Sequence, residues 1–319
     1  FNTDTKHLEY FRGDTIGWSE VEASNEELNG GYRGLTAGGN SPAKEDEIEY
    51  ITISTLGNSI DFGNLIAAAS GKAGSASRTR GIFQGGTDGS YMDEIDYVTI
   101  STTGNAADFG NMTVTNGYRS SVSSQTRSVT ASGSDPKIDV IDYITIAQTG
   151  NAVDFGNLSA DREKPVAFQS TTRGIYAGGT EPTAVNTIEY ITIATTGNAV
   201  DFGDTREPLS ASAGCSNATR GIIKDRIGSS PYYTNSMSYL TIATLGNSID
   251  FGDFINNVGG CAPMASPTRA VFAGGYGAPS FKADIGYVEI LTTGNAVDFG
   301  DLTYGADHVA GCSNGHGGL

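Results

Sequence analysis

The chain repeats one stretch six times, first as Tyr50-Ile-Thr-Ile-Ser-Thr-Leu-Gly-Asn-Ser-Ile-Asp-Phe-Gly63. The other copies begin at Tyr97, Tyr143, Tyr190, Tyr239 and Tyr287. In every copy an Asp follows the Tyr by eleven positions, and successive Asp residues lie 47, 46, 47, 49 and 48 positions apart. A period of this length, built from short strands and turns, is typical of a propeller or a repeat array. The pattern therefore predicts an all-β fold made of six units.

Two other stretches recur at fixed places between these copies. One is apolar and ends in a double glycine, as in Arg33-Gly-Leu-Thr-Ala-Gly-Gly39, which predicts a strand covered on both faces. The other is rich in Gly, Ala and Ser, as in residues 67–77 and 211–217. A flexible linker is the alternative for such a composition. However, the Asp-to-Arg distance is 19 in all five complete copies, which favours a strand crowded against its symmetry mates at a central axis.

This order of strands resembles the kelch repeat. Kelch repeats carry a double glycine after the second strand and a Tyr in the third, as this chain does. They usually have a Trp where this chain has the Phe of Asp-Phe-Gly, so the repeat is kelch-like. The resemblance covers residues 30–319 and implies a six-bladed propeller of four-stranded antiparallel blades around a central channel.

The two ends of the repeat region predict how the ring closes. The chain ends on a small-residue strand, Val309-Ala-Gly-Cys-Ser-Asn314, while the strand from Arg33 to Gly39 has no such strand before it. We expect these two strands to pair in the first blade, which would remove the open sheet edges. The domain organisation is then a short β segment for attachment or assembly at 1–29, followed by the propeller at 30–319.

The segment before the ring has its own pattern. It begins Phe1-Asn-Thr-Asp-Thr, continues through Leu8-Glu-Tyr, and carries the chain's single tryptophan, Trp18. We expect two short strands around a turn at Arg12-Gly-Asp14, with Trp18 closing the pair. The Arg-Gly-Asp triplet is better explained by this turn than by integrin binding. The segment is similar to one common in tail and fibre proteins of tailed bacteriophages.

Composition excludes several classes of partner. The formal net charge is -17, so a phosphate backbone is an unsuitable ligand and no nucleic-acid partner is predicted. No apolar run reaches eighteen residues, so no membrane insertion is predicted. No signal peptide is evident. The chain starts at Phe1, which leaves open that it is a fragment of a longer protein.

The three cysteines, Cys215, Cys261 and Cys312, lack metal-site spacing and are interpreted as small buried thiols.

The loops divide into a uniform face and a varied face. The uniform face carries the Thr-x-Gly-Asn turns and the turns before each repeat Arg, whereas the loops after the second and fourth strands differ in sequence and form the varied face. Our hypothesis is that the varied face binds a partner, because aromatic side chains supply rigid contact area. The alternative is that exposed loops drift without constraint. The candidate contacts are Tyr91, Tyr118, Tyr232, Tyr233, Tyr276 and Phe281.

The repeated Asp-Phe-Gly matches a kinase metal-binding triplet, but six copies without a catalytic loop exclude that interpretation. A calcium ring is also disfavoured, because no calcium-binding loop is present, so no metal or other cofactor is predicted. We expect each Asp to accept backbone hydrogen bonds or to pair with a repeat Arg. The aspartates are Asp61, Asp108, Asp154, Asp201, Asp250 and Asp298, and the arginines are Arg80, Arg127, Arg173, Arg220 and Arg269.

Catalysis has little support in the sequence. The three histidines, His7, His308 and His316, lie at the chain ends, and no nucleophile motif is present. The chain is therefore predicted to be non-enzymatic. A propeller glycosidase or lyase would require one polar cluster in the channel that breaks the repeat, and Arg220 to Met237 is the most divergent stretch in which to find it.

These features predict a bacteriophage virion component: a tail fibre, tail or capsid-surface protein that displays its loops. Repeats such as Thr196-Gly-Asn198 with Asp201-Phe-Gly203 also look like those of marine phage structural proteins. The implied partners are other virion proteins and a host surface glycan or protein. The alternative is a secreted or cell-surface, lectin-like bacterial propeller. Whether the chain forms a homo-oligomer is left open.

Overall fold

The computed structural model of the 319-residue chain describes residues 9–11, 18–20 and 31–319. The chain divides into two compact units, residues 1–31 and 32–319. In the first unit β1 (Glu9–Phe11) pairs antiparallel with β2 (Trp18–Glu20), and Phe11 lies opposite Trp18. This is the expected pair of strands, and its turn at Arg12 to Asp14 lies outside the described residues. No helix in the described ranges is long and apolar enough to cross a membrane.

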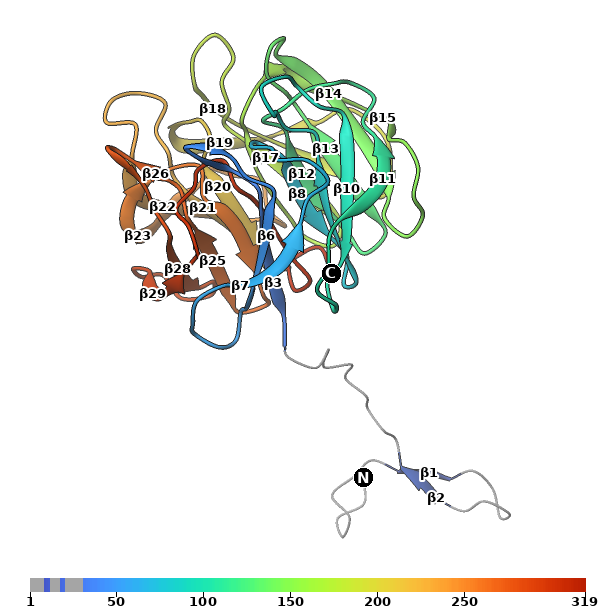
Figure 1. Ribbon diagram of the computed structural model, residues 1–319. Coiled ribbons are helices and arrows are strands. Elements are labelled where there is room, and N and C mark those ends of the chain that lie inside the picture. The colour runs from blue at the N-terminus through green and yellow to red at the C-terminus, as the bar shows by residue number, and fades with distance from the viewer. Residues whose placement is uncertain (1–8, 12–17, 21–30) are drawn as a thin grey trace. The chain divides into compact units, whose positions relative to one another are not determined.

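The larger unit is a six-bladed β-propeller of four-stranded antiparallel sheets, as predicted (Figure 1). From the innermost strand outward, blade one is β30 (Ala310–Ser313), β3 (Arg33–Ala37), β6 (Glu47–Thr52) and β7 (Ile60–Asn64). Blade two is β8 (Ala73–Ala76), β9 (Arg80–Gln84), β10 (Glu94–Thr99) and β11 (Ala107–Asn111). Blade three is β12 (Ser120–Ser123), β13 (Arg127–Ala131), β14 (Ile138–Thr145) and β15 (Val153–Arg162).

The remaining blades follow the same order. Blade four is β16 (Val166–Gln169), β17 (Arg173–Ala177), β18 (Val185–Thr192) and β19 (Val200–Leu209). Blade five is β20 (Ala213–Ser216), β21 (Arg220–Lys224), β22 (Thr234–Thr241) and β23 (Ile249–Val258). Blade six is β24 (Ala262–Ala265), β25 (Arg269–Ala273), β28 (Asp284–Glu289) and β29 (Val297–Asp301). Two small hairpins lie in loops of blades one and six: β4 (Asn40–Ser41) with β5 (Ala43–Lys44), and β26 (Tyr276–Gly277) with β27 (Ser280–Phe281).

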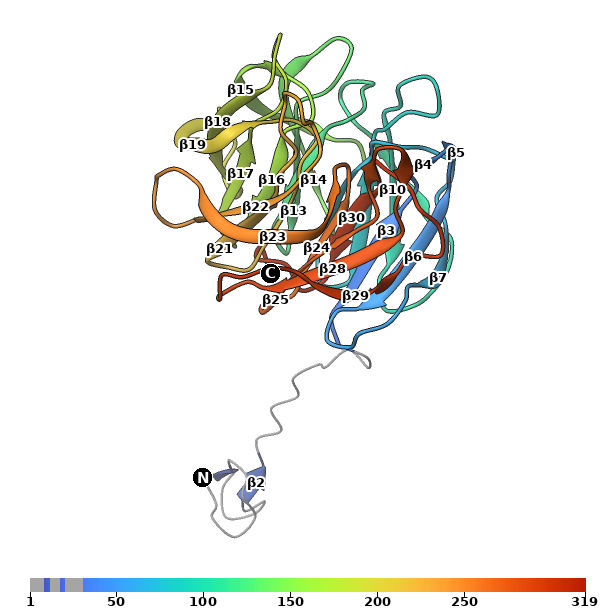
Figure 2. The same ribbon diagram turned by 90° about the vertical axis from the view of Figure 1, so that its left-hand side faces the viewer.

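The ring closes as the sequence predicts. The last strand, β30, lies beside β3 (Figure 2) and pairs with it, so that Cys312 is opposite Leu35. The small-residue strands are the innermost ones and contact one another around the axis. The crowding is direct, because a Cβ atom added to Gly74 would lie 2.3 Å from the carbonyl oxygen of Gly311 in the neighbouring blade. Small side chains are therefore required where the six inner strands converge.

The repeated Tyr, Phe and Arg form one stack in every blade. Each Tyr contacts the Phe of its Asp-Phe-Gly edge-on, with ring centroids 5.8 to 6.1 Å apart. Each repeat Arg lies 4.3 to 4.8 Å above the same Tyr ring. It also donates a hydrogen bond to a carbonyl of the next blade, as Arg80 does to Ile146 at 2.8 Å. Cation–π and hydrogen-bond contacts thus join neighbouring blades.

The expected Asp–Arg contacts are wrong. Within the described residues no repeat Arg pairs with a repeat Asp, and the six aspartates are exposed on the outermost strands. The reason is that the Tyr ring holds the guanidinium over the third strand, away from the fourth. Asp250 instead pairs with Arg206 at 2.7 Å, and Asp108 accepts a backbone hydrogen bond from Gly110 at 3.1 Å.

The Gly-Asn turn joins each blade to the preceding one. Gly104 donates its N–H to the carbonyl of Phe62 at 2.7 Å, and the side-chain oxygen of Asn105 accepts the N–H of Asn64 at 3.1 Å. Equivalent pairs occur at all six interfaces. Gly63 has φ 145° and would bring an added Cβ within 2.5 Å of Gly104. The glycine of Asp-Phe-Gly is therefore required by the turn that docks on it.

The blades differ in height on the varied face. The two outer strands have 8 and 10 residues in blades three, four and five, against 6 and 5 in blades one, two and six. The green and yellow loops of the taller blades extend furthest from the ring at the top of Figure 1. The Asp-to-Arg spacing is nevertheless constant, because the extra strand residues come from the loop.

Candidate binding face and channel mouth

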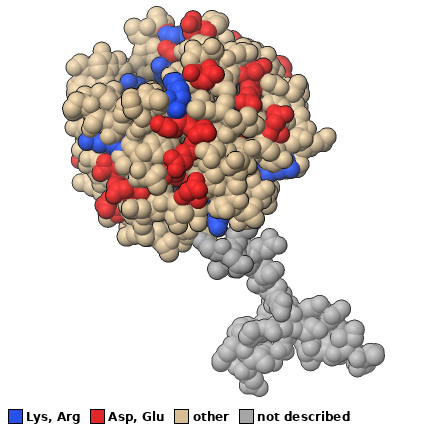
Figure 3. All heavy atoms as spheres, viewed as in Figure 1, with Lys and Arg blue, Asp and Glu red and all other residues tan. Residues whose placement is uncertain are grey.

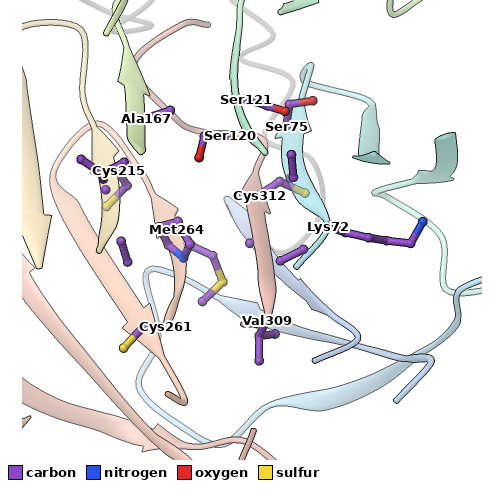
Figure 4. Close-up of a pocket in the computed structure, with 18 of the residues that line it drawn as sticks. Lys72, Ser75, Ser120, Ser121, Ala167, Cys215, Cys261, Met264, Val309 and Cys312 are labelled. Carbon is purple, nitrogen blue, oxygen red and sulfur yellow. The ribbon is translucent and has the colours of Figure 1, made fainter. Parts of the chain in front are cut away.

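The six innermost strands surround a central cavity of about 140 Å³. Its wall consists mainly of Gly, Ala, Ser and backbone atoms, with the sulfur atoms of Cys215 and Cys312 on two of the strands (Figure 4). All three cysteines are free and buried, as expected. Burial raises the pKa of Cys215 and Cys312 to about 12 and that of Cys261 to about 11. These thiols therefore stay protonated and act as packing groups.

The C-terminal tail closes the cavity at the uniform face. His316 donates from Nε2 to the carbonyl of Ala76 at 2.8 Å, and its Nδ1 accepts from Gly318 N–H at 3.1 Å and Gln169 Nε2 at 2.7 Å. Gly317 donates to the carbonyl of Ser216 at 2.8 Å. The tail thus links blades two, four and five. Burial lowers the pKa of His316 to about 4, so the ring is neutral at pH 7 and can keep Nδ1 as an acceptor.

The other end of the cavity opens within a ring of backbone on the varied face. In each blade the residue two positions before the inner strand has a left-handed conformation, with φ between 52° and 72°. Five inter-blade hydrogen bonds link successive members, as in Tyr118 N–H to Gly71 carbonyl at 2.9 Å. Four members are not glycine, although this conformation costs them free energy and such strain gathers at functional sites. The members are Gly71, Tyr118, Lys164, Ala211, Gly260 and His308.

Three of these residues place unlike side chains side by side. The Tyr118 ring contacts the His308 ring edge-on at 5.0 Å, and Lys164 Nζ lies 4.5 Å above the Tyr118 ring. Gly71 makes room for this arrangement, because an added Cβ would lie 2.7 Å from the Tyr118 ring. Lys164 also lies 3.5 Å from Glu163. This cluster breaks the repeat at the mouth of the cavity, with members from blades one, three and four.

The electrostatic environment keeps His308 uncharged. Burial first, and then the positive charges of Lys164, Arg226 and Lys44, lower its pKa. Asp307 lies 3.8 Å from His308 Nε2 and is the acidic group facing it. At neutral pH the mouth therefore presents a neutral imidazole, a phenol and an ammonium group.

The predicted contact residues fall into two groups. Tyr233, Tyr276 and Phe281 form an aromatic cluster between blades five and six, with centroids 5.4 and 5.3 Å apart and Arg226 5.4 Å above Tyr233. Tyr232 is 54% exposed beside them. Tyr118 is at the mouth, and Tyr91 lies close to the preceding Gly117. Their role in binding stays a prediction.

Sequence reasoning missed a set of buried ion pairs. Lys72 pairs with Asp96 at 2.9 Å, Arg119 with Asp142 at 2.7 Å, and Arg162 with Glu189 at 3.0 Å. Lys72 extends away from the cavity into its blade (Figure 4). Burial raises the pKa of Asp96, although the Lys72 charge opposes that shift. Two signals were available in the sequence: an acid before the repeat Tyr in all three pairs, and a cation eight positions before the repeat Arg in two of them, Lys72 and Arg119.

The divergent stretch of blade five also contains a polar group, but not in the channel. Lys224 donates to the carbonyls of Asp225, Thr234 and Val258 at 3.0, 2.6 and 2.8 Å. Burial lowers the pKa of Lys224 and raises that of Asp225 to about 6. Neither residue lines the cavity. The place expected for a catalytic cluster therefore holds a buried structural network.

Comparison with known proteins adds no family. No protein-family model matches the chain, and no curated protein matches it.

The surface agrees with the acidic composition, since Figure 3 shows acidic side chains spread over several regions of one side.

Proposed function

We propose that this chain is a non-enzymatic binding protein that presents the varied face of a rigid six-bladed ring, as a component of a tailed-bacteriophage virion. The observation that carries the proposal is the difference between the two faces. At the uniform face the same Gly-Asn turn joins every pair of blades, and the C-terminal tail closes the cavity. The varied face instead carries the aromatic cluster and the cavity mouth with its left-handed backbone ring. Binding residues are disproportionately found on loops held by a rigid scaffold.

The virion setting rests on two sequence resemblances. Residues 1–20 resemble tail and fibre proteins of tailed bacteriophages, and the kelch-like repeats resemble those of marine phage structural proteins. The chain leaves the propeller at Tyr32, whose carbonyl accepts the N–H of Ile53 beside a uniform-face turn. An N-terminal attachment would therefore join the ring at the uniform face and leave the varied face available to a host glycan or protein.

Electron microscopy of the native assembly that carries this chain tests the proposal. We expect density for the propeller held through its N-terminal unit, with the varied face directed outward. A propeller whose varied face is buried against the assembly, or a chain that is a free monomer in its native source, would overturn it.

Carbohydrate binding by a lectin-like propeller is the second candidate, favoured by the aromatic cluster of Tyr233, Tyr276 and Phe281 and by exposed Tyr232. Aromatic faces stack on sugars. A glycan array with the intact chain and with Tyr232→Ala tests it. Leu245→Ala, which removes another residue that is 60% exposed, is the control. Glycan binding that only Tyr232→Ala weakens supports this candidate, and an array without signal removes it.

A propeller glycosidase or lyase is a third candidate, and the cluster of Tyr118, Lys164 and His308 is the place where its chemistry would occur. The mutual contacts of these side chains favour a positioning role in binding. Release of reducing sugar ends from a bound polysaccharide, lost in Tyr118→Phe, would establish this candidate instead.

A further inference from the structure

The central cavity has no carboxylate in its lining. The chain has 36 Asp and Glu residues and a formal net charge of -17, yet none of the described residues that line the cavity is acidic. Cationic side chains do reach the lining, at Lys72, Arg119 and Lys164. The wall between them consists mainly of small residues (Figure 4). An anionic group that enters the cavity therefore meets no acidic side chain there, although the chain as a whole repels it.

Of these three cations, Lys164 is the one placed to meet a ligand. Lys72 and Arg119 each pair with a buried aspartate, at 2.9 and 2.7 Å, and both side chains are at most 1% exposed. Lys164 is 27% exposed and belongs to the left-handed ring at the mouth, with φ 55°. Its Nζ lies 4.5 Å above the centroid of the Tyr118 ring.

Two further cations lie beside the mouth. Lys44, from the small hairpin of blade one, donates from Nζ to Ser70 Oγ at 2.6 Å, next to a member of the left-handed ring. Arg226, from blade five, packs against Gly259, since a Cβ atom on that glycine would lie 2.1 Å from the arginine Cδ. After burial, the charges of both residues lower the pKa of His308. Cations from blades one, four and five thus converge on the opening.

Two carboxylates face the same opening, and each is shared among cations. Glu163 lies 3.5 Å from Lys164 and 3.7 Å from Lys137. Asp307 lies 3.8 Å from His308 Nε2, and burial raises its pKa against the charges of the two cations beside the mouth. The three cations at the mouth therefore outnumber the two carboxylates, one of which also pairs with Lys137. This balance suits a ligand with one negative charge better than a doubly charged phosphate.

The cavity has the size of a single sugar residue. Its volume is about 140 Å³, which is room for roughly ten water molecules. A sugar ring with its substituents has a similar number of non-hydrogen atoms. Tyr118 adds an aromatic ring and a hydroxyl at the entrance, and such groups stack on sugars and hydrogen-bond to them.

We infer that the mouth binds an acidic sugar, with the sugar carboxylate beside Lys164 and the sugar ring directed into the cavity. The charges of Lys44 and Arg226 attract the ligand to the opening, and the neutral imidazole of His308 and the Tyr118 hydroxyl bond the sugar hydroxyls. The inference rests on the binding role proposed for the varied face and names its class of ligand. Uronic acids and nonulosonic acids share the required chemistry, a carboxylate on a sugar ring.

Isothermal titration calorimetry of the intact chain tests the inference, with D-glucuronate and N-acetylneuraminate as probes. Glucose is the neutral counterpart of glucuronate, and inorganic phosphate is the anion without a sugar. We expect one of the two acids to bind with a Kd on the order of 1 mM, about tenfold more tightly than glucose or phosphate. Added NaCl should weaken this binding. Equal binding of glucuronate and glucose, binding of phosphate as tight as that of the acids, or no binding of either acid would overturn the inference.

A pair of variants places the ligand at the mouth. Lys164→Gln should weaken binding of the acid about tenfold, and it keeps a non-glycine residue at the same backbone position. Lys282→Gln is the matched control, because it removes the same charge from a loop of blade six and does not line the cavity. It should retain binding, and equal losses in both variants would overturn the inference. If Lys164→Gln does not fold, the comparison of glucuronate with glucose on the native chain still decides the question.

Failure of this inference can be told apart from failure of the proposed function. Binding of neutral glycans alone on the glycan array would overturn the acidic-sugar inference and leave the varied face as a binding surface. Binding of an acidic sugar by a chain whose varied face is buried in its native assembly would support the inference and overturn the proposed display role.

Discussion

The uniform face and the varied face are ends of the same six blades, yet they are held together in different ways. At the uniform face every interface uses the same Gly-Asn turn on the same Phe-Gly strand, with an Arg–Tyr contact beside it. At the varied face the blades meet through a strained backbone ring whose side chains are unlike. The repeated contacts therefore stabilise the ring at the uniform face, so the loops of the varied face can differ between blades.

Acid should destabilise both faces, because each holds a buried histidine whose pKa is lowered: His316 closes the cavity at the uniform face and His308 lies at the mouth. His316 has a pKa of about 4 in the folded chain, below its ordinary 6.5. Above pH 6.5 its contribution to stability is complete. As the pH falls from 6.5 to 4 the unfolded chain binds a proton that the folded chain does not. The free energy of unfolding should therefore fall by about 3 kcal/mol from this group.

The measurement is the free energy of unfolding by denaturant at pH 7 and pH 4 for the native chain and His316→Gln. The difference between the two chains isolates His316 from carboxylates such as Asp225, whose raised pKa opposes the trend. His308→Gln is the matching variant at the varied face, where burial and nearby cations also lower the pKa of the imidazole, so it should likewise remove part of the pH dependence. An equal pH dependence in the native chain and His316→Gln would contradict the proposed contribution of His316 to acid sensitivity.

The docking of the turns predicts the next largest effect. Gly110 and Gly104 have similar φ values of 144° and 155°, so an alanine strains the backbone alike at both. The space available to an added side chain differs between the two positions. A Cβ atom on Gly110 would lie 2.5 Å from the Gly150 carbonyl oxygen, whereas no atom lies within 4 Å of a Cβ atom on Gly104. Gly110→Ala should therefore cost about 2 kcal/mol more than Gly104→Ala in chemical denaturation. Equal losses of unfolding free energy in the two variants would mean that backbone conformation alone explains why both positions are glycine.

The Arg–Tyr contact should contribute less. Arg127 lies 4.7 Å above Tyr143 and donates to the carbonyls of Ile193 at 3.3 Å and Ala194 at 2.8 Å in the next blade. Arg127→Ala should lower the free energy of unfolding by about 1.5 kcal/mol. Arg78→Ala removes an exposed arginine from the same face and should be nearly neutral. Comparable losses in both variants would argue for a general charge effect.

The two faces also differ in how far the sequence predicts them. Ring closure, the six blades and the small inner strands follow from spacing, because each repeat must place the same residue in the same environment. The Asp–Arg contact was predicted wrongly, since spacing does not reveal that the Tyr ring holds the guanidinium away from the outer strand. The sequence also did not predict the grouping of Tyr118, Lys164 and His308, because these residues belong to different blades and come together only when the ring closes. Tyr233, Tyr276 and Phe281 were each named from the sequence, but not their mutual contact.

The smallest expected effect on stability lies at the mouth. Ala211 has φ 54° at a ring position where Gly71 and Gly260 show that glycine is accommodated. In Ala211→Gly the relief of strain and the greater freedom of the unfolded chain oppose each other, so the free energy of unfolding should change by less than about 0.5 kcal/mol. Gly71→Ala, the reverse change three members away in the ring, should cost more because the Tyr118 ring occupies the space.

Lys164→Gly extends the same comparison to function. Lys164 has φ 55°, and its side chain contacts Tyr118 and Glu163 at a half-buried site, so its loss should also change stability only slightly. If the strained members of the ring are kept for binding, this variant should lose affinity for whatever partner the assembly or the glycan array identifies, while Ala211→Gly retains it. Affinity retained in both variants would show that the mouth is structural and would move the binding surface to the aromatic cluster of blades five and six.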